Sequence, residues 1–290
     1  MIDKTKLKKQ LHEKELGSFY KTVGGSEGEK CFYPTRLDTY GKGCYYDCKY
    51  CYAKGLLDFR GMWNPNDPAV PDIKEIINVI RTIPSGAVVR LGGMTDCFQP
   101  KEFVERSTHK TIQLLNKKKV HYLIVTKSTY PIRKEYLKLM DKKLAHIQIS
   151  IATDDNDVLR ATDNAPTYEK RVRTAETLQK EGFDVSLRLA PFLFETTNID
   201  KINKIKVDKC LVEFLRINGK ITKALGGLIN PEHYTVSEGG YNHLPLQTKL
   251  DLLSKLHFKE MSVCDDVDEH YNYFLKNYNH NPKDCCNLTL

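Results

Sequence analysis

The sequence has no apolar run long enough to cross a bilayer, and its first residues, MIDKTKLKKQLHEKELG, lack the apolar stretch of a secretory signal. It also shows no internal repeat and no low-complexity segment. We therefore expect a cytoplasmic protein without a membrane partner. The 290 residues, 40% hydrophobic and 28% charged, suffice for one large or two small α/β domains with a sizeable core.

A strong excess of one charge is also missing. The net charge of +8 favours polyanionic partners, with nucleic acid first among them. The lysines are scattered along the chain, however, so a solvated lysine-rich surface explains the charge equally well. The charge can support a nucleic-acid partner, but it does not by itself indicate one.

The cysteines lack the even, paired pattern of a disulfide framework. In a reducing compartment the nine cysteines indicate metal ligands, catalytic groups or small buried residues. Three of them, Cys44, Cys48 and Cys51, fall within eight residues in GKGCYYDCKYCYAK, with the spacing C-x3-C-x2-C. Three thiolates can hold three irons of a 4Fe–4S cluster and leave the fourth iron open. The alternatives are a zinc site that takes its fourth ligand from elsewhere, or three packed thiols.

Apolar runs alternate with helical patterns through the first three quarters of the chain, which predicts parallel βαβ units in an open sheet or a partial barrel. The expected strands are 35–44, 87–93, 120–128, 144–153, 183–191 and 210–218, and the expected helices are 73–83, 109–119, 132–143, 168–182 and 202–209. Beyond these we expect helices at 247–258 and 268–281 and a strand at 260–264. Function is expected at the carboxyl ends of the strands.

The segments GCYYDCKYCYAK, GGMTDCFQPKE, IVTKS and RATDNAPTYEKRVRTAETLQKEGFDVSLRLAP, with the aromatic Tyr50 before the third cysteine, carry a family resemblance. The chain resembles the spore photoproduct lyase group of the radical S-adenosylmethionine (SAM) superfamily over roughly residues 33–230. The resemblance implies a partial (β/α)6 TIM-like barrel, residues 31–230. From the sequence pattern we expect an N-terminal arm or short helix, 1–30, and a C-terminal α-rich extension, 231–290, packed on the barrel.

The resemblance also implies the cofactors. Cys44, Cys48 and Cys51 would hold a 4Fe–4S cluster, and the amino and carboxylate groups of SAM would chelate the open iron. One electron, delivered by a flavodoxin or ferredoxin type of partner, would cleave SAM to a 5′-deoxyadenosyl radical. The cofactor supplies this chemistry, and the protein supplies positioning and the exclusion of water.

The implied SAM contacts lie near strand ends: Tyr50, Gly92, Gly93, Thr95, Lys127, Ser150 and Arg188. A carboxylate favours a cation or a hydroxyl donor, and a glycine pair allows close approach of backbone to the amino group. Thr95 and Ser150 could instead only cap strand ends, and Lys127 could be a surface residue. Arg188 is a candidate by position alone.

Cys97, Tyr52 and Asp96 are the candidate catalytic residues. Tyr50 and Tyr52 match two tyrosines thought to relay a hydrogen atom in the spore lyase, although Tyr52 could simply pack beneath the cluster. Asp96 could bind substrate or cap the helix that follows. The spore lyase has its hydrogen-donating cysteine where this chain has Gly93, so repair of spore photoproduct cannot be carried over. Cys97 is close by, as a hydrogen donor, a radical site or a packed thiol.

The tail holds three further cysteines, Cys264, Cys285 and Cys286, which could bind an auxiliary cluster or zinc, or be reactive or buried thiols. Adjacent cysteines can aim both sulfurs at one site only if the loop is bent. Cys31 and Cys210 are expected to be structural.

Three functions follow. The first is a radical enzyme that repairs or modifies a nucleic acid base or nucleotide. The second is a radical enzyme that modifies a peptide or small metabolite and carries an auxiliary tail site. The third is a metal-binding interaction protein without catalysis, which would not cleave SAM.

Overall fold

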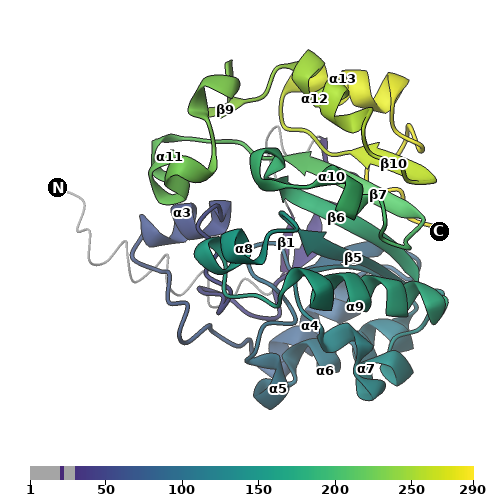
Figure 1. Ribbon diagram of the computed structural model, residues 1–290. Helices are drawn as coiled ribbons and strands as arrows, with labels where there is room; N and C mark the ends of the chain where they lie inside the picture. The colour runs from purple at the N-terminus through teal and green to yellow at the C-terminus, as the bar shows by residue number, and fades with distance from the viewer. Residues whose placement is uncertain (1–19, 23–29) are drawn as a thin grey trace. The chain divides into compact units, whose positions relative to one another are not determined.

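The computed structural model describes residues 20–22 and 30–290 (Figure 1). The chain divides into two compact units, Met1–His146 and Ile147–Leu290. Most of the expected N-terminal arm, 1–30, lies outside the described residues, and the expected boundary at residue 231 stays a prediction. Within the described part of the chain, no helix is long and apolar enough to span a membrane.

The first unit contains four neighbouring strands: β1 (Tyr20–Thr22), β2 (Thr35–Leu37), β3 (Val88–Leu91) and β4 (His121–Thr126). β1 pairs antiparallel with β2, whereas β2, β3 and β4 are parallel. Helices α4 (Ile73–Thr82), α6 (Ser107–Lys118) and α7 (Lys134–Leu139) lie side by side (Figure 1). Two shorter helices, α3 (Tyr52–Asp58) and α5 (Glu102–Glu105), follow the cysteine loop and β3.

Helix α4 shows why these segments fold as the sequence predicts. Its apolar residues are spaced so that Ile76 and Ile80 are buried together on one face. The Asp72 carboxylate accepts a hydrogen bond from the Lys74 amide at 2.6 Å and so caps the amino end of the helix. The strands β3 and β4 that follow carry buried apolar residues such as Val89 and Ile124.

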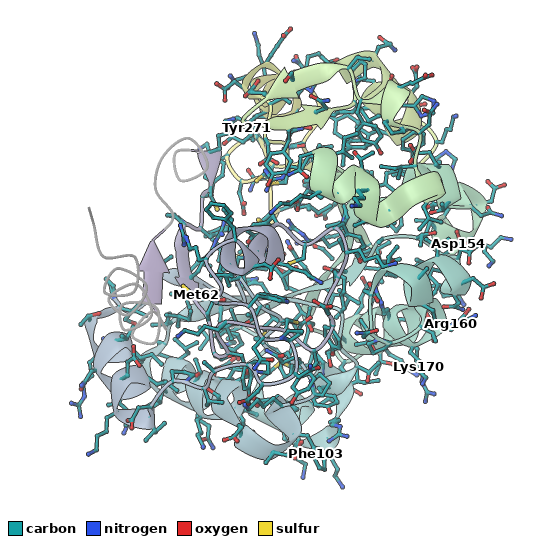
Figure 2. The ribbon with its side chains drawn as sticks, turned by 90° about the vertical axis from the view of Figure 1, so that its left-hand side faces the viewer. Met62, Phe103, Asp154, Arg160, Lys170 and Tyr271 are labelled. Carbon is teal, nitrogen blue, oxygen red and sulfur yellow. The ribbon has the colours of Figure 1, made fainter. Side chains whose placement is uncertain are left out.

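The second unit continues with parallel strands. β6 (Asp184–Phe192) pairs with β7 (Lys209–Phe214), and β7 pairs with β10 (Glu260–Val263). Strand β5 (Ala145–Ile151) runs across the division between the units. The other elements are α8 (Asn156–Thr162), α9 (Tyr168–Lys180), α10 (Ile199–Ile202), α11 (Gly219–Leu225), the hairpin of β8 (Val236–Glu238) and β9 (Tyr241–His243), α12 (Leu246–Leu253) and α13 (Asp268–Asn277). Arg160 on α8 and Lys170 on α9 are exposed (Figure 2).

Most expected elements are confirmed, with shorter ends. One is wrong: the helix expected at 202–209 is largely irregular, and α10 precedes it. The Asn198 side chain accepts from the Lys201 amide at 3.3 Å and starts the helix early, and Asn203 ends it. The strand expected at 260–264 is confirmed as β10, which pairs parallel with β7. Helices α3, α8 and α11 and the β8–β9 hairpin were not expected.

A buried carboxylate holds the first unit together where the cysteine loop begins. Glu102 is fully buried, and its oxygens accept hydrogen bonds from the Tyr40 hydroxyl, the Tyr136 hydroxyl (2.5 Å) and the amides of Thr108 and His109 (both 2.9 Å). Burial, and then the nearby Glu102 charge, raise the pKa values of both tyrosines, so the hydroxyls stay protonated and donate. Glu102 thereby ties α5, α6 and α7 to the base of the cysteine loop.

We predict that Glu102→Ala lowers the free energy of unfolding by about 3–5 kcal/mol, because four buried donors lose their acceptor. Glu102→Gln should cost less, about 1–2 kcal/mol, because one oxygen still accepts from two donors and the facing tyrosine hydroxyl can turn to accept from the new NH2 group, so that only one backbone amide loses its acceptor. Urea unfolding followed by fluorescence of Trp63, the single tryptophan of the chain, measures the first unit. Glu105→Gln on the same helix is the control. Equal midpoints for all four proteins would contradict the prediction.

Candidate functional site

The three loop cysteines lie between β2 and α3, on a segment folded by two short turns. The Asp47 amide donates to the Cys44 carbonyl at 3.0 Å, and the Cys51 amide donates to the Cys48 carbonyl at 3.1 Å. Asp47 has a left-handed backbone, with a φ of 37°. Cys51 immediately precedes α3, and all three thiols are free of disulfides. The loop therefore presents three thiols from one short stretch of backbone.

Residues outside the loop fix its shape. The side chain of the fully buried Gln99 accepts from the Tyr45 amide at 3.0 Å and donates to the Gly43 carbonyl at 3.5 Å. The Asp47 carboxylate accepts from the Trp63 indole at 3.1 Å and pairs with Lys54 at 2.8 Å. At Gly43 a Cβ atom would lie 1.9 Å from the Asn64 carbonyl oxygen, so only glycine fits there.

The thiols fit an iron–sulfur cluster better than a single ion. Ligand atoms of one tetrahedral zinc lie about 3.8 Å apart for sulfur pairs, whereas cluster cysteines bind different irons and stand further apart. Among the described residues, Cys44, Cys48 and Cys51 are not within the 4.8 Å mutual spacing of a single-ion site. Burial raises the pKa of Cys44, as do Asp96 and Cys48, and burial raises that of Cys51. Iron binding would displace the thiol protons.

The turn after β3 carries the two predicted glycines and Thr95. The amides of Gly93 and Met94 both donate to Asp38, at 2.7 and 2.9 Å. The Gly93 carbonyl accepts from the Tyr52 hydroxyl, and the Thr95 hydroxyl donates to the Tyr40 carbonyl at 2.6 Å. The turn and the cysteine loop are thus hydrogen-bonded to each other at both ends.

The glycine pair also has a local reason. Gly92 has a φ of +83°, and a Cβ there would lie 2.8 Å from the Thr95 carbonyl oxygen. A Cβ on Gly93 would lie 2.6 Å from the Arg36 side chain. The turn therefore needs glycines whether or not a ligand approaches it.

Asp96 fastens this turn to the end of β4. One carboxylate oxygen accepts from the Thr126 hydroxyl at 2.7 Å and the Phe98 amide at 2.8 Å, and the other accepts from the Lys127 amide at 2.8 Å. Burial raises the pKa of Asp96, against the effect of these three hydrogen bonds. The carboxylate is thus used by the protein itself, which favours a positioning role over substrate contact.

Cys97, the candidate hydrogen donor, has no exposed surface. Burial, with Asp96 and Glu102 nearby, raises the pKa of its thiol well above the ordinary value. This placement favours the packed-thiol interpretation, and the catalytic role of Cys97 stays a prediction.

Lys127 and Tyr50 do come together beside the third cysteine. The Lys127 ammonium lies 5.5 Å from the centre of the Tyr50 ring, within the range of a cation–π interaction. Its charge also acts to lower the pKa of Cys51, although burial outweighs it. Lys127 therefore places a positive charge next to the cysteine loop, where an anionic cofactor group would be stabilised.

In the second unit, Ser150 is buried near the end of β5, and its carbonyl accepts from Arg171 at 3.5 Å. Arg171 is fully buried and pairs with Asp163 at 2.7 Å. The TDNAPTYEKR segment, part of a motif that carries the family resemblance, therefore stabilises the backbone at the end of β5. Arg188 differs from expectation: it lies in the middle of β6, not at its end, and contacts Gln148 (2.7 Å) and Glu213.

The tail cysteines gather in the second unit. The sulfurs of Cys285 and Cys286 and the Asp284 carboxylate lie within 4.8 Å of one another. Hydrogen bonds to Cys264 and Cys286, and then burial, raise the pKa of Cys285. Burial lowers the pKa of Arg188, but Glu213 and the Cys264 and Cys286 thiols outweigh it and raise the pKa overall. Cys210 is buried within β7, as expected of a structural cysteine.

Sequence reasoning did not find Asp38, Gln99 or Glu102, the buried polar residues that shape the loop and the turn. Gln99 and Glu102 belong to the GGMTDCFQPKE motif, and this membership was the one sequence signal that pointed to a role for them at the site. Asp38 directly follows the observed strand β2, whereas the predicted strand continued to residue 44 and so concealed this strand end.

Comparison with known proteins identifies the family. The sequence model of the radical SAM superfamily matches residues 39–205, more than half of the chain. The chain belongs to the radical SAM superfamily. It is therefore an enzyme, and the cofactors of a radical SAM enzyme, a 4Fe–4S cluster and SAM, are the ones the sequence predicts. A search of curated proteins finds no match.

Solved structures show the fold of this radical SAM enzyme. A spore photoproduct lyase mutant with bound AdoMet and dinucleoside spore photoproduct matches with a TM-score of 0.58 at 12% identity, over 88% of this chain and 90% of that chain. Spore photoproduct lyase complexed with dinucleoside spore photoproduct matches with a TM-score of 0.59 at 13% identity, over 82% and 74%. The predicted α/β class with a partial TIM-like barrel is confirmed.

We predict that Asp96→Asn lowers the free energy of unfolding by about 1–3 kcal/mol, because an amide nitrogen would face one of the three donors. Trp63 fluorescence during urea unfolding measures the loss of stability. The iron content after reconstitution measures how well the cysteine loop still binds a cluster. Asp67→Asn is the control, since Asp67 is 76% exposed and its ion pair with Lys101 contributes little. If Asp96 served only substrate chemistry, stability would be unchanged while cleavage of SAM fell.

Proposed function

We propose that Cys44, Cys48 and Cys51 hold the 4Fe–4S cluster, and that the enzyme repairs or modifies a nucleic acid base or nucleotide. The observation that carries the first part is a loop of three thiols that form no disulfide and are spaced too widely for one ion, inside the segment that matches the family. When bound, the cluster and SAM supply a 5′-deoxyadenosyl radical. The chain's own residues then decide where that radical is formed and what it meets.

Lys127 would receive the SAM carboxylate. Its ammonium is held over Tyr50 and close to Cys51, and its backbone is fixed by Asp96. A carboxylate that enters between these groups gains a charge-assisted hydrogen bond. Gly92, Gly93 and Thr95 would line the adjacent backbone, while Tyr52 keeps the turn attached to the loop through the Gly93 carbonyl.

The nucleic acid substrate rests on two supports. The fold likeness extends over most of both chains to a lyase whose structure holds a dinucleoside spore photoproduct, and the chain carries a net charge of +8. The reaction need not be that of the lyase, because Gly93 stands where the lyase has its hydrogen-donating cysteine. A flavodoxin or ferredoxin type of protein would deliver the electron.

We predict that alanine at any one of Cys44, Cys48 and Cys51 abolishes formation of 5′-deoxyadenosine from SAM under dithionite, because a cluster iron loses its ligand. Anaerobically reconstituted wild-type protein should be brown and release this product. Cys210→Ala, a buried cysteine of the second unit, should retain both properties. A fully loaded wild-type enzyme that releases no 5′-deoxyadenosine would exclude the proposed function and favour a non-catalytic metal-binding protein.

We also predict that the reconstituted enzyme binds single-stranded or damaged DNA or RNA with an affinity that falls at least several-fold between about 50 and 200 mM salt. Gel shifts at the two salt concentrations test this, with an acidic peptide of similar charge as control. Binding to neither nucleic acid, together with retained SAM cleavage, would favour the peptide or metabolite alternative.

A further inference from the structure

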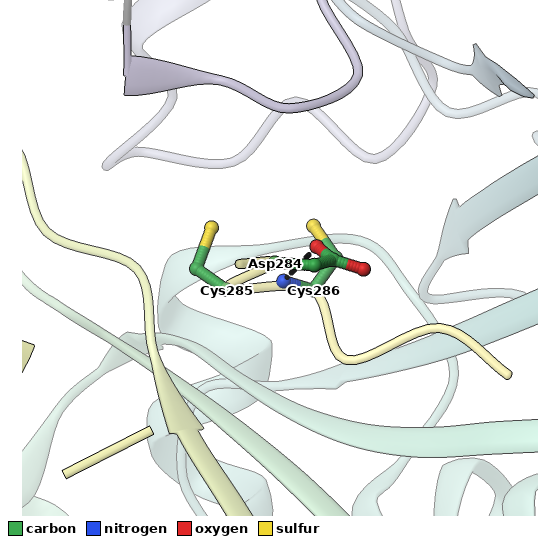
Figure 3. Close-up of side chains that lie close together, drawn as sticks. All are labelled: Asp284, Cys285 and Cys286. Carbon is green, nitrogen blue, oxygen red and sulfur yellow. Dashed lines mark hydrogen bonds between the residues drawn. The ribbon is translucent and has the colours of Figure 1, made fainter. Parts of the chain in front are cut away.

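The tail brings together a second set of thiols, far in sequence from the loop cysteines. Cys264 follows β10 directly, and Cys285 and Cys286 lie 21 and 22 residues later. The Cys285 thiol is in hydrogen-bonding contact with the thiols of both Cys264 and Cys286. The sulfurs of Cys285 and Cys286 point to the same side of the chain, with the Asp284 carboxylate beside them (Figure 3).

Adjacent cysteines reach this arrangement because the backbone bends sharply. The Asp284 carboxylate accepts from the Cys286 amide at 2.8 Å and from the Leu288 amide at 3.1 Å. Asn287 adopts a left-handed backbone, with a φ of 51°. These hydrogen bonds hold the Asp284 carboxylate beside the two sulfurs.

The bend is anchored on the sheet of the second unit. The Lys209 ammonium donates to the Asn287 carbonyl (2.9 Å) and the Thr289 hydroxyl (2.7 Å), and the Asp184 carboxylate accepts from the Thr289 amide at 2.9 Å. Asn287 also donates to Glu260 at 2.8 Å. Residues 287–289 are therefore tied to the first residues of β6, β7 and β10.

The tail thiols lie against the sheet face that carries Asp184, Lys209 and Glu260, but further along the strands. Side chains four positions apart on a strand share a face. Arg188, Glu213 and Cys264 lie four positions beyond Asp184, Lys209 and Glu260, respectively. The Gln148 side chain donates to the Cys286 carbonyl at 3.5 Å, and Arg188 lies near the thiols of Cys264 and Cys286. The tail thus crosses a polar face and presents three sulfurs beside a buried guanidinium.

From this geometry we propose that Cys264, Cys285, Cys286 and Asp284 bind one thiophilic divalent metal ion of the Zn²⁺ class. Three thiolates and a carboxylate complete a tetrahedral set, and soft sulfur donors select such ions. The donor atoms of Asp284, Cys285 and Cys286 lie within 4.8 Å of one another, a spacing that suits ligands of a single ion, and Cys264 adjoins this group through its contact with Cys285. Arg188 supplies positive charge next to an anionic ligand set. The ion would join the tail to the end of β10.

The test uses the full chain with Cys44, Cys48 and Cys51 all changed to alanine, so that no metal binds at the loop. This protein, stripped of metal and reduced, is titrated with Zn²⁺ and the bound zinc is counted by mass spectrometry after gel filtration. We expect about one zinc per chain and a higher melting temperature with zinc than without. Co²⁺ in place of zinc should give the thiolate charge-transfer and d–d absorption of a tetrahedral, sulfur-rich site.

Adding Cys285→Ser and Cys286→Ser, or Cys264→Ser alone as the milder change, should remove or weaken zinc binding, while Cys210→Ala should retain it. Circular dichroism confirms that each variant is folded. Absence of zinc from the folded parent protein would show packed thiols only and overturn the proposal. So would zinc retained in the Cys285→Ser/Cys286→Ser protein, or about four irons with sulfide after anaerobic reconstitution of the parent, which would indicate a cluster.

Discussion

The Asp96 carboxylate is the interaction on which the geometry of the candidate SAM site depends. It joins the turn after β3 to the end of β4 through three hydrogen bonds, and the same turn is bonded to the cysteine loop through Tyr52 and Thr95. A loop of eight residues cannot keep three thiols in place by itself. Its shape is imposed by buried polar residues that follow it in sequence, Asp96, Gln99 and Glu102, which belong to one motif.

The two sets of cysteines differ in the property that decides what they can bind. The loop spreads its thiols along two turns, and the tail folds two adjacent residues back so that their sulfurs converge. A cubane needs separated ligands because each cysteine reaches a different iron, whereas one ion needs ligands close together. The second set lies in the same unit as Arg188, which was expected to contact SAM. In the structure, Arg188 instead pairs with Glu213 and lies near the tail thiols.

Most strands and helices and the cysteine loop could be predicted from the sequence. The elements and contacts that were not predicted lacked the same local signals. Strand β4 contains the apolar run Tyr122–Val125, β6 alternates apolar and polar residues from Val185 to Leu189, and the cysteine spacing is specific. The β8–β9 hairpin was missed because its strands are only three residues long, and α10 was misplaced because a cap at Asn198 decided its start. The partners of Glu102 and the position of Arg188 depend on contacts between distant segments, which no local pattern encodes. The bend at Asp284 did have a local indication, an aspartate that can accept from the amide two residues on.

The close contact at Gly43 matters for mutagenesis of this enzyme. The neighbouring Asn64 carbonyl leaves no room for a side chain, while Lys49, inside the same loop, is exposed. In saturation libraries around the cysteines, the fraction of folded variants would therefore depend strongly on which position is randomised. Codons at 49 can be randomised with most products still folded, and randomisation at 43 would fill the library with inactive members before any selection for a new substrate begins.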